Sequence, residues 1–391
     1  VKIENYLSRA TSHYNNSVIL KLFKKNIMHI CKKIEVRPLL TIVFCLWNLS
    51  MQAQSTRKYS NAFMDIGVNA AALGMANAVV SNTSDINATY WNPAGLSQLE
   101  SKQMALMHAN YFANIANYNF LAYGMPIDDD RSIGVSIIRF GVDDILDTTQ
   151  LIDENGNINY DRISRFSNTD YAITMSYAKR LPMKGFSYGI NAKVIRRIIG
   201  DYANSWGFGF DLGIQFQSKS NWKFGAMVRD ITTTYNSWTI NEAKFNQIRD
   251  AVDGENQSIP EGNEITIPKL QLGLSKTFNF NYDYKLTAAL DAIVRFEQTN
   301  DIISNSFASV TPALGFEFSY IDMIYARSGV GNFQNELNFD DSTSLSIQPN
   351  IGLGFKFKGI QLDYALTNIG NQSESLYSNV FSLVMDFSIF K

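Results

Sequence analysis

The sequence predicts an all-β membrane protein: an antiparallel outer-membrane barrel of about 14 strands with a small helical plug at its N-terminal end. Three observations carry this prediction. Residues 103–390 alternate apolar and polar side chains in segments of roughly ten residues, as membrane-spanning strands do. Residues 66–80, before them, are rich in Gly and Ala, which favours close packing in a confined space. A segment typical of secretory leaders precedes both.

Residues 1–53 are expected to be a mis-called start followed by a signal peptide. The chain opens on Val1 with no consistent period, and Met28 is the better start. A basic stretch, the apolar run 39–49 and a cleavage site at 51–53 then follow in the order of a signal peptide. A membrane anchor is the alternative, but it needs about 20 apolar residues.

Both cysteines, Cys31 and Cys45, lie in this leader. A lipid anchor on Cys45 is disfavoured because bulky Phe44 stands before it, where a small residue is wanted. Without the leader the chain has no Cys for a disulfide, a thiolate metal site or a nucleophile, and we expect no metal and no cofactor. His108 is then the one histidine, and a single His in a strand is more often packed or interfacial than catalytic.

The charge balance argues against nucleic acid as a partner. Removal of residues 1–53 takes away 8 basic and 2 acidic residues, which leaves 26 basic and 34 acidic ones and a net charge of −8. Charged residues make up 18% of the whole chain, against about 25% in ordinary soluble domains. A chain this poor in charge, without a long apolar helix, can enter a membrane only as a closed sheet.

Strand parity predicts which side chains face lipid. Residues 206–216 place Trp206, Phe208 and Phe210 on one face and Gly207, Gly209 and Asp211 on the other. Lys or Arg on the lipid face costs about 2–4 kcal/mol near the midplane, so charges should point into the lumen. The charges expected there are Lys193, Asp211, Asp291, Lys356, Asp363 and Asp386. The strands of a soluble β-sandwich would also alternate apolar and polar side chains. A sandwich does not predict so uniformly bulky an outer face in a chain that also begins with a signal peptide.

The links between strands give a separate test of the barrel. The expected strands lie near residues 103–112, 117–126, 131–140, 168–179, 186–197, 204–217, 221–230, 267–278, 284–295, 308–318, 322–329, 345–357, 359–368 and 379–390. The long links are residues 141–167, 231–266, 296–307, 331–344 and 369–378. With the N-terminus periplasmic, all of these fall on the external side, and the short turns fall on the periplasmic side, as in outer-membrane barrels. Residues 103–391 are therefore assigned to the barrel.

Residues 54–102 are expected to form the plug. The inward glycines leave room beside the wall, and the Ala-rich run with Tyr90 and Trp91 favours packing over solvation. A disordered periplasmic tail is the alternative. The proposed plug motif is Tyr90, Trp91, Asn92, Pro93, Ala94 and Gly95.

Residues 85–96, which contain this motif, together with residues 74–78 upstream resemble the N-terminal signature of the PorV/PorQ family of Bacteroidetes outer-membrane proteins. That family is related to the FadL long-chain fatty-acid transporters, whose plug carries an Asn-Pro-Ala motif matched here by Asn92, Pro93 and Ala94. The resemblance implies a FadL-like barrel of about 14 strands with an N-terminal hatch, set in the cell outer membrane among its lipids. It further implies a role in type IX secretion, with a large translocon barrel or sorting-domain cargo as partners.

Three functions stay open on the sequence. The favoured one is a type IX secretion component that binds proteins through its external loops, and that preference comes from the resemblance. The second is a FadL-like channel with a hydrophobic small-molecule ligand. The third, an enzyme, is disfavoured: lumen charges such as Lys193, Asp291 and Arg295 could supply acid or base, but no Ser, His and acid set is available, so we expect no catalytic residues.

Overall fold

The computed structural model describes residues 61–111, 115–152, 156–244, 262–338, 342–367 and 378–390, without the side chains of 389 and 390. The expected leader, 1–53, and the first residues of the expected plug lie outside the described residues. Everything below refers to this described part of the chain.

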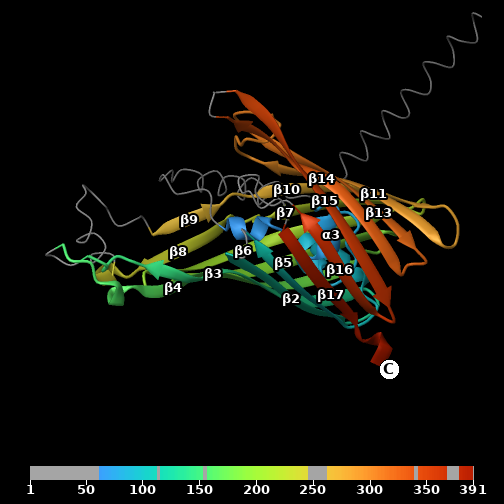
Figure 1. Cartoon of the computed structure of the whole chain (residues 1–391). Coiled ribbons are helices and arrows are strands. Elements are labelled where there is room, and N and C mark those ends of the chain that lie inside the picture. The colour runs from blue at the N-terminus through green and yellow to red at the C-terminus, as the bar shows by residue number, and fades with distance from the viewer. Residues whose placement is uncertain are drawn as a thin grey trace, which may run out of the picture. The chain divides into compact units, whose positions relative to one another are not determined.

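The strands form one antiparallel sheet that closes on itself, because the first strand pairs with the last (Figure 1). The strands are β1 (Gln103–Tyr111), β2 (Ala116–Pro126), β3 (Arg131–Asp147), β4 (Ser164–Arg180), β5 (Phe186–Ile199), β6 (Ala203–Gln217), β7 (Trp222–Arg229), β8 (Thr234–Ile240), β9 (Asn263–Thr266), β10 (Lys269–Asn279), β11 (Tyr284–Arg295), β12 (Ile303–Ser304), β13 (Ser309–Tyr320), β14 (Ile324–Leu337), β15 (Thr343–Phe357), β16 (Ile360–Thr367) and β17 (Ser378–Asp386). Of these, β8 continues the wall beyond β7, β9 does so beyond β10, and β12 is a short addition beside β13. The wall is thus a closed barrel of 14 strands, and the fold prediction is confirmed.

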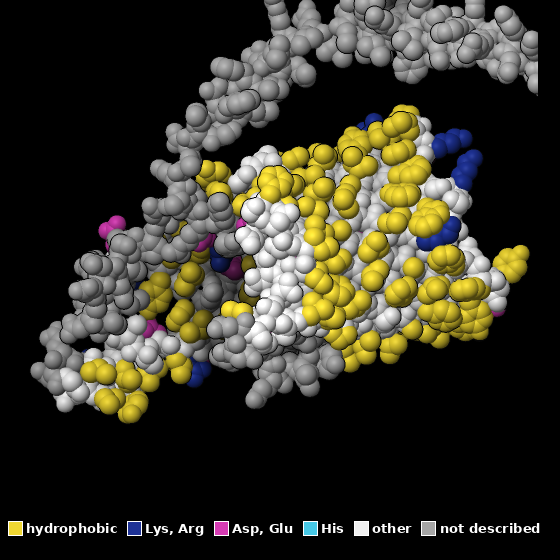
Figure 2. Space-filling model, turned by 90° about the horizontal axis from the view of Figure 1, so that it is seen from above, with side chains coloured by type: hydrophobic (Ala, Val, Ile, Leu, Met, Phe, Trp, Pro, Cys, Tyr) yellow, Lys and Arg dark blue, Asp and Glu magenta, His cyan; other side chains and the backbone are white. Residues whose placement is uncertain are grey.

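Side chains alternate across this wall as the parity predicts. On β6, Trp206, Phe208 and Phe210 are exposed on the outer surface, whereas Gly207 and Gly209 are buried on the inner one. Figure 2 shows one face of the wall covered by rows of hydrophobic side chains with few charged ones among them. Among the described residues, no helix has the length and apolar character needed to cross a membrane.

The strands run further than the sequence predicted on the external side. Residues 141–147 and 164–167, expected in a link, extend β3 and β4, and the link 231–266 contains β8 and β9 (Figure 1). These extensions are polar or mixed on both faces, since water bathes both sides of a hairpin beyond the membrane, so they lack the clean alternation that marks a spanning strand.

The last strand is shorter than predicted. It ends at Asp386, and Phe387–Phe390 form a 3-10 helix, so the strand predicted to run to residue 390 stops four residues earlier. The Asp386 carboxylate causes this stop, because it accepts a hydrogen bond from the Ser388 amide at 2.9 Å and turns the backbone away from the ladder.

A large bulge separates β7 from β8. Three residues of β6, between Phe208 and Leu212, lie opposite six residues between Val228 and Tyr235. The extra residues turn with positive φ at Asp230 (55°) and Thr233 (60°). The wall is therefore irregular at this point, and the buried side chain of Asp230 reaches the inward-facing Lys193.

Inside the barrel, the plug is built from short helices rather than one long helix. They are η2 (Ala62–Asp65), α3 (Ala70–Gly74), α4 (Ala88–Trp91) and η3 (Pro93–Gln98). The plug packs against two separate parts of the wall, since α3 contacts β15 and β16 while η3 contacts β4 and β5. Turns at Ala76 and Asn77, both with positive φ, separate the helices.

Candidate functional site

The plug motif ties the plug to itself and to the wall. The Trp91 Nε1 donates to the Val68 carbonyl at 3.0 Å, and its ring meets the Tyr90 ring edge-on at 4.7 Å. The side-chain Nδ2 of Asn92 donates to the carbonyls of Val80 (3.0 Å) and Ile214 (3.1 Å), and so joins two plug segments to β6. Its Oδ1 also accepts from the Ala94 amide and caps η3, with Pro93 in the first helical turn.

The rest of the motif fits because of its small size. A Cβ on Gly95 would lie 2.2 Å from the Thr83 carbonyl oxygen. On the wall, a Cβ on Gly189 would lie 2.3 Å from the Pro93 carbonyl carbon, so plug and wall are in backbone contact here. Gly95 therefore permits close packing within the plug, and Gly189 permits the close approach between η3 and β5.

Arg229, which the sequence analysis did not single out, fixes this motif from β7. Its guanidinium lies 4.2 Å from the centre of the Tyr90 ring, and its Nη2 donates to the Tyr90 carbonyl at 2.9 Å. The Nε donates to the Gln271 Oε1 at 3.2 Å. An Arg at the end of a strand belongs to no sequence motif that would identify it. Only its place among the inward-facing positions of the predicted strand 221–230 could have indicated that it lies in the lumen.

Two of the predicted lumen charges belong to a buried ion cluster at the bulge. The Lys193 ammonium lies 2.7 Å from a carboxylate oxygen of Asp211 and 2.7 Å from one of Asp230. Asp363 belongs to a second cluster, in which the Arg327 guanidinium lies 2.7 Å from Asp363 and 2.6 Å from Glu317. In each cluster one cation bridges two carboxylates of the wall, so these groups are already engaged in holding the strands together.

The other three charges predicted in the lumen do not lie together. Lys356 is exposed near the periplasmic end of β15. At the same end, Asp386 accepts hydrogen bonds from Ser101 (2.5 Å) and Gln103 (3.3 Å), which tie the end of the plug segment to the last strand. Asp291 lies elsewhere, buried against the plug in mid-barrel.

A cavity of about 300 Å³ lies between the plug and the wall formed by β10 to β16, and we call it the plug cavity. Its apolar lining includes Ile66, Leu73, Val80, Trp91 and Ile293. Its polar lining includes Asp65, Asn77, Gln271, Asp291, Arg295, Thr311, Asn332, Gln348, Asn350 and Thr367. Apolar and polar side chains thus share the lining about equally, so a ligand would find both apolar contacts and hydrogen-bonding groups there.

Two of the charged groups in the plug cavity are already paired. The Asp65 carboxylate lies 2.5 Å from the Lys269 ammonium, and the Arg295 guanidinium lies 3.2 Å from Asp301. Burial opposes ionisation of Asp65, but the charge and hydrogen bond of Lys269, together with the charges of Arg295 and Arg229, hold the pKa of this carboxyl below its usual value. Both pairs are therefore ionic, and neither leaves a net charge for a ligand.

Asp291 differs from these pairs. Its Oδ2 accepts a hydrogen bond from the Val80 amide at 2.8 Å, but its Oδ1 has no hydrogen-bond partner among the described residues. The side chain lies over Gly273, its register partner on β10, where a Cβ would come within 2.6 Å of that Oδ1. Glycine at 273 thus makes room for the carboxyl group.

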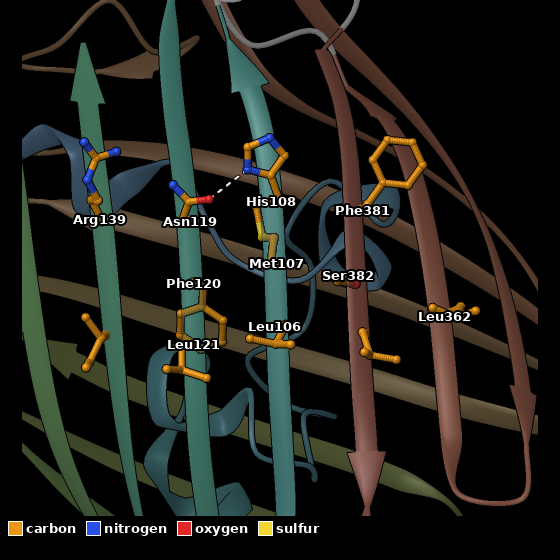
Figure 3. A pocket seen from close by; sticks show the side chains of 12 residues that line it. Leu106, Met107, His108, Asn119, Phe120, Leu121, Arg139, Leu362, Phe381 and Ser382 are labelled. Atoms are coloured by element: carbon orange, nitrogen blue, oxygen red, sulfur yellow. Dashed lines mark hydrogen bonds between the residues drawn. The ribbon is translucent and has the colours of Figure 1, made fainter. Parts of the chain in front are cut away.

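A second, open groove lies on the outer wall (Figure 3). Leu106, Leu121 and Leu362 line its apolar part, and His108 and Arg139 lie toward its external end. The His108 Nδ1 lies 2.7 Å from the Asn119 Oδ1. His108 is exposed on this surface, away from the lumen and the plug cavity.

Among the described residues, no group of His, Cys, Asp and Glu side chains has a geometry that could hold a metal ion. The lumen polar groups form ion pairs and helix caps, and Asp291 is the plug-cavity carboxyl that has no cationic partner among the described residues. The arrangement can therefore bind and orient a small molecule by contact and hydrogen bonding.

Known structures resemble this barrel over most of its length. The CymD monoaromatic hydrocarbon channel aligns with 13% identity and a TM-score of 0.50, over 82% of this chain and 98% of its own. The Pseudomonas putida toluene transporter TodX aligns with 13% identity and a TM-score of 0.50, over 82% and 99%. The fold is that of a FadL-like outer-membrane barrel. The apolar wall and this fold place the protein in the outer membrane.

A Pseudomonas aeruginosa FadL homologue also aligns, with 13% identity and a TM-score of 0.47, over 82% of this chain and 98% of its own. No protein-family model matches the sequence, and no curated protein matches it. The FadL-like fold rests on the two structures above with TM-scores of 0.50. Membership of the PorV/PorQ family stays a prediction from the plug motif.

Proposed function

We propose that this FadL-like barrel is a channel for small hydrophobic molecules and that the plug cavity binds them. The observation that carries the proposal is the cavity itself, in which Trp91, Leu73 and Ile293 form an apolar lining between plug and wall. Its volume of about 300 Å³ is at the lower end for small-molecule sites and suits a ligand with one ring. The similar structures are described as a monoaromatic hydrocarbon channel and a toluene transporter.

Binding of toluene to the purified full chain in detergent tests this proposal. Ala313 lines the plug cavity, whereas its neighbour Leu314 points outward from β13. Ala313→Phe fills the cavity and should weaken binding by at least about tenfold, the loss expected when a ring no longer fits its pocket. Leu314→Phe, the matched control, should bind as the unchanged chain does. Equal affinity of both variants would contradict the plug cavity as the site.

The sequence resemblance supports a second candidate function, a component of the type IX secretion system. The external hairpin of β3 and β4 carries exposed apolar side chains, including Leu146, Ile152, Ile158 and Tyr160, which water alone does not favour. We propose that this surface would contact a large translocon barrel or sorting-domain cargo. The backbone contact between plug and wall at Gly189 suits a barrel that stays closed while it binds proteins.

Purification of the tagged chain from native outer membranes in a gentle detergent separates the two functions. A secretion component should co-purify with translocon or cargo proteins, and Leu146→Ser with Ile158→Ser should reduce that recovery. The same double variant should still bind toluene if the channel function holds. Recovery of the unchanged chain without any secretion protein would remove the second candidate.

A further inference from the structure

We propose that the plug cavity prefers ligands that carry a primary amine beside an aromatic or aliphatic body, and that Asp291 is the residue that selects them. This inference rests on the proposed small-molecule function of the cavity. The inference goes beyond that function because an apolar lining alone would favour a hydrocarbon without a polar group.

The preference for an amine follows from which charged groups in the cavity already have a partner of opposite charge. Of the charged groups that line the plug cavity in the described structure, Asp65 pairs with Lys269, and Arg295 pairs with Asp301. Arg295 also donates to Thr311 at 2.6 Å, which further occupies its guanidinium. Asp291 has no cationic partner among the described residues, and only its Oδ2 is hydrogen-bonded.

A buried carboxyl oxygen without a partner is unfavourable, because it has lost water and gained nothing in return. Asp291 is only 4% exposed, so bulk water does not solvate it. An ammonium group of a ligand would supply both the missing donor and the missing positive charge, and charge-assisted hydrogen bonds are the stronger kind.

A neighbouring group in the plug adds to this preference. The Asn77 Oδ1 is buried, lines the same cavity and has no hydrogen-bond partner among the described residues. Two residues that line the cavity, one on the wall and one on the plug, thus each carry a buried acceptor oxygen without a hydrogen-bond partner among the described residues. An amine offers up to three donors, and a hydrocarbon offers none.

Four probes with one ring and different head groups test the inference: toluene, benzyl alcohol, benzylamine and benzoate. Their affinities are measured by calorimetry on the full chain in detergent. Benzylamine should bind about tenfold more tightly than toluene, and benzoate should bind most weakly, because a charge-assisted hydrogen bond is made in the first case and charge repulsion arises in the last.

Asp291→Asn tests the residue itself. This variant keeps the shape of the side chain and removes its charge, so benzylamine binding should fall about tenfold while toluene binding stays within about twofold. Asp386→Asn is the matched control, since this carboxylate lies at the periplasmic end, where it bonds Ser101 and Gln103. It should leave the ranking of the four probes unchanged.

The outcomes separate this inference from the function on which it rests. Toluene or benzoate as the tightest probe would overturn the amine preference and leave a hydrophobic channel standing. Unchanged benzylamine affinity in Asp291→Asn would overturn the role of Asp291. Failure of all four probes to bind the unchanged chain would overturn the proposed function itself. The ranking on the unchanged chain decides the preference even if Asp291→Asn fails to assemble.

Discussion

Lys193 holds two carboxylates at the point where the wall bends. Its ammonium lies 2.7 Å from both Asp211 and Asp230, and all three groups are buried. Gly209 makes room for the bulge, since a Cβ there would lie 2.0 Å from the Thr234 hydroxyl. The bend is thus stabilised by one ammonium shared between two acids.

Lys193→Met should destabilise the barrel by about 3–5 kcal/mol, because it leaves two buried carboxylates without a counter-charge. The loss is measured as a lower temperature at which the folded form disappears in heat-modifiability gels. Replacing all three groups, as Lys193→Met with Asp211→Asn and Asp230→Asn, should recover part of it. A single variant as stable as the unchanged chain would show that the cluster is not needed for the bend.

Trp91 is the largest side chain of the plug motif and is only 3% exposed. Trp91→Ala removes its hydrogen bond to Val68 and its contact with Tyr90, and should cost about 3–5 kcal/mol. The loosened plug should increase leakage of small hydrophilic dyes from liposomes that contain the protein. Trp206→Ala, on the lipid-facing side, should leave leakage unchanged; equal leakage from both would argue against a packed plug.

At the scale of elements, plug and wall approach each other through glycines. A Cβ on Gly225 of β7 would lie 2.4 Å from the Val80 carbonyl oxygen, whereas one on Gly331 of β14 would have its nearest neighbour at 3.4 Å, in the Ala76 side chain. The first approach is backbone against backbone and cannot relax by a side-chain movement. The second is an ordinary contact.

Gly225→Ala should therefore loosen the plug, and Gly331→Ala should not. Overpacking of this kind costs about 1–3 kcal/mol, and limited proteolysis of the folded barrel should then cut the plug segment faster in the first variant only. Equal resistance of the two variants would mean that the plug can shift away from β7 without loss of packing.

The elements also show where a sequence is informative. Strand positions could be predicted because lipid excludes charge from one face, so Phe208 and Phe210 stand against Gly209 and Asp211. The ends of the strands could not be predicted, because water lies on both sides of the β3–β4 hairpin and its side chains need not alternate between apolar and polar. Nor could the partner of Asp291, because Val80 is 211 residues away along the chain.

On the scale of the whole molecule, the outer wall is a lipid-facing belt of bulky side chains (Figure 2). Phe210, in the middle of β6, is 52% exposed on it. Phe210→Arg should cost about 2–4 kcal/mol at the bilayer midplane, which is measured by urea titration of refolding in liposomes. Tyr160→Arg, in the external hairpin, should refold as the unchanged chain does. Normal refolding of Phe210→Arg would reverse the assignment of faces.

The whole molecule also marks the limit of sequence reasoning about the site. The motif from Tyr90 to Gly95 could be identified as a plug because of its place before the strands, but the plug cavity could not. It is lined from β10 to β16 and by Ile66, Leu73 and Trp91, and only the closed barrel brings these together. Arg229, which holds Tyr90, was missed for the same reason.

The contacts of Asn69 have a consequence for the order in which the chain can fold. Its Oδ1 accepts from the Ser382 hydroxyl at 2.9 Å, and that hydroxyl accepts from the Ala70 amide at 3.0 Å, across more than 310 residues. The plug is made first during synthesis, yet its partners on β16 and β17 are made last. The apolar side chains of the plug therefore stay exposed until the last strands have been translocated. Contacts between residues so far apart in the chain also form slowly. Exposed apolar surface of this kind favours aggregation, so we expect the plug to need protection until the last strands have paired.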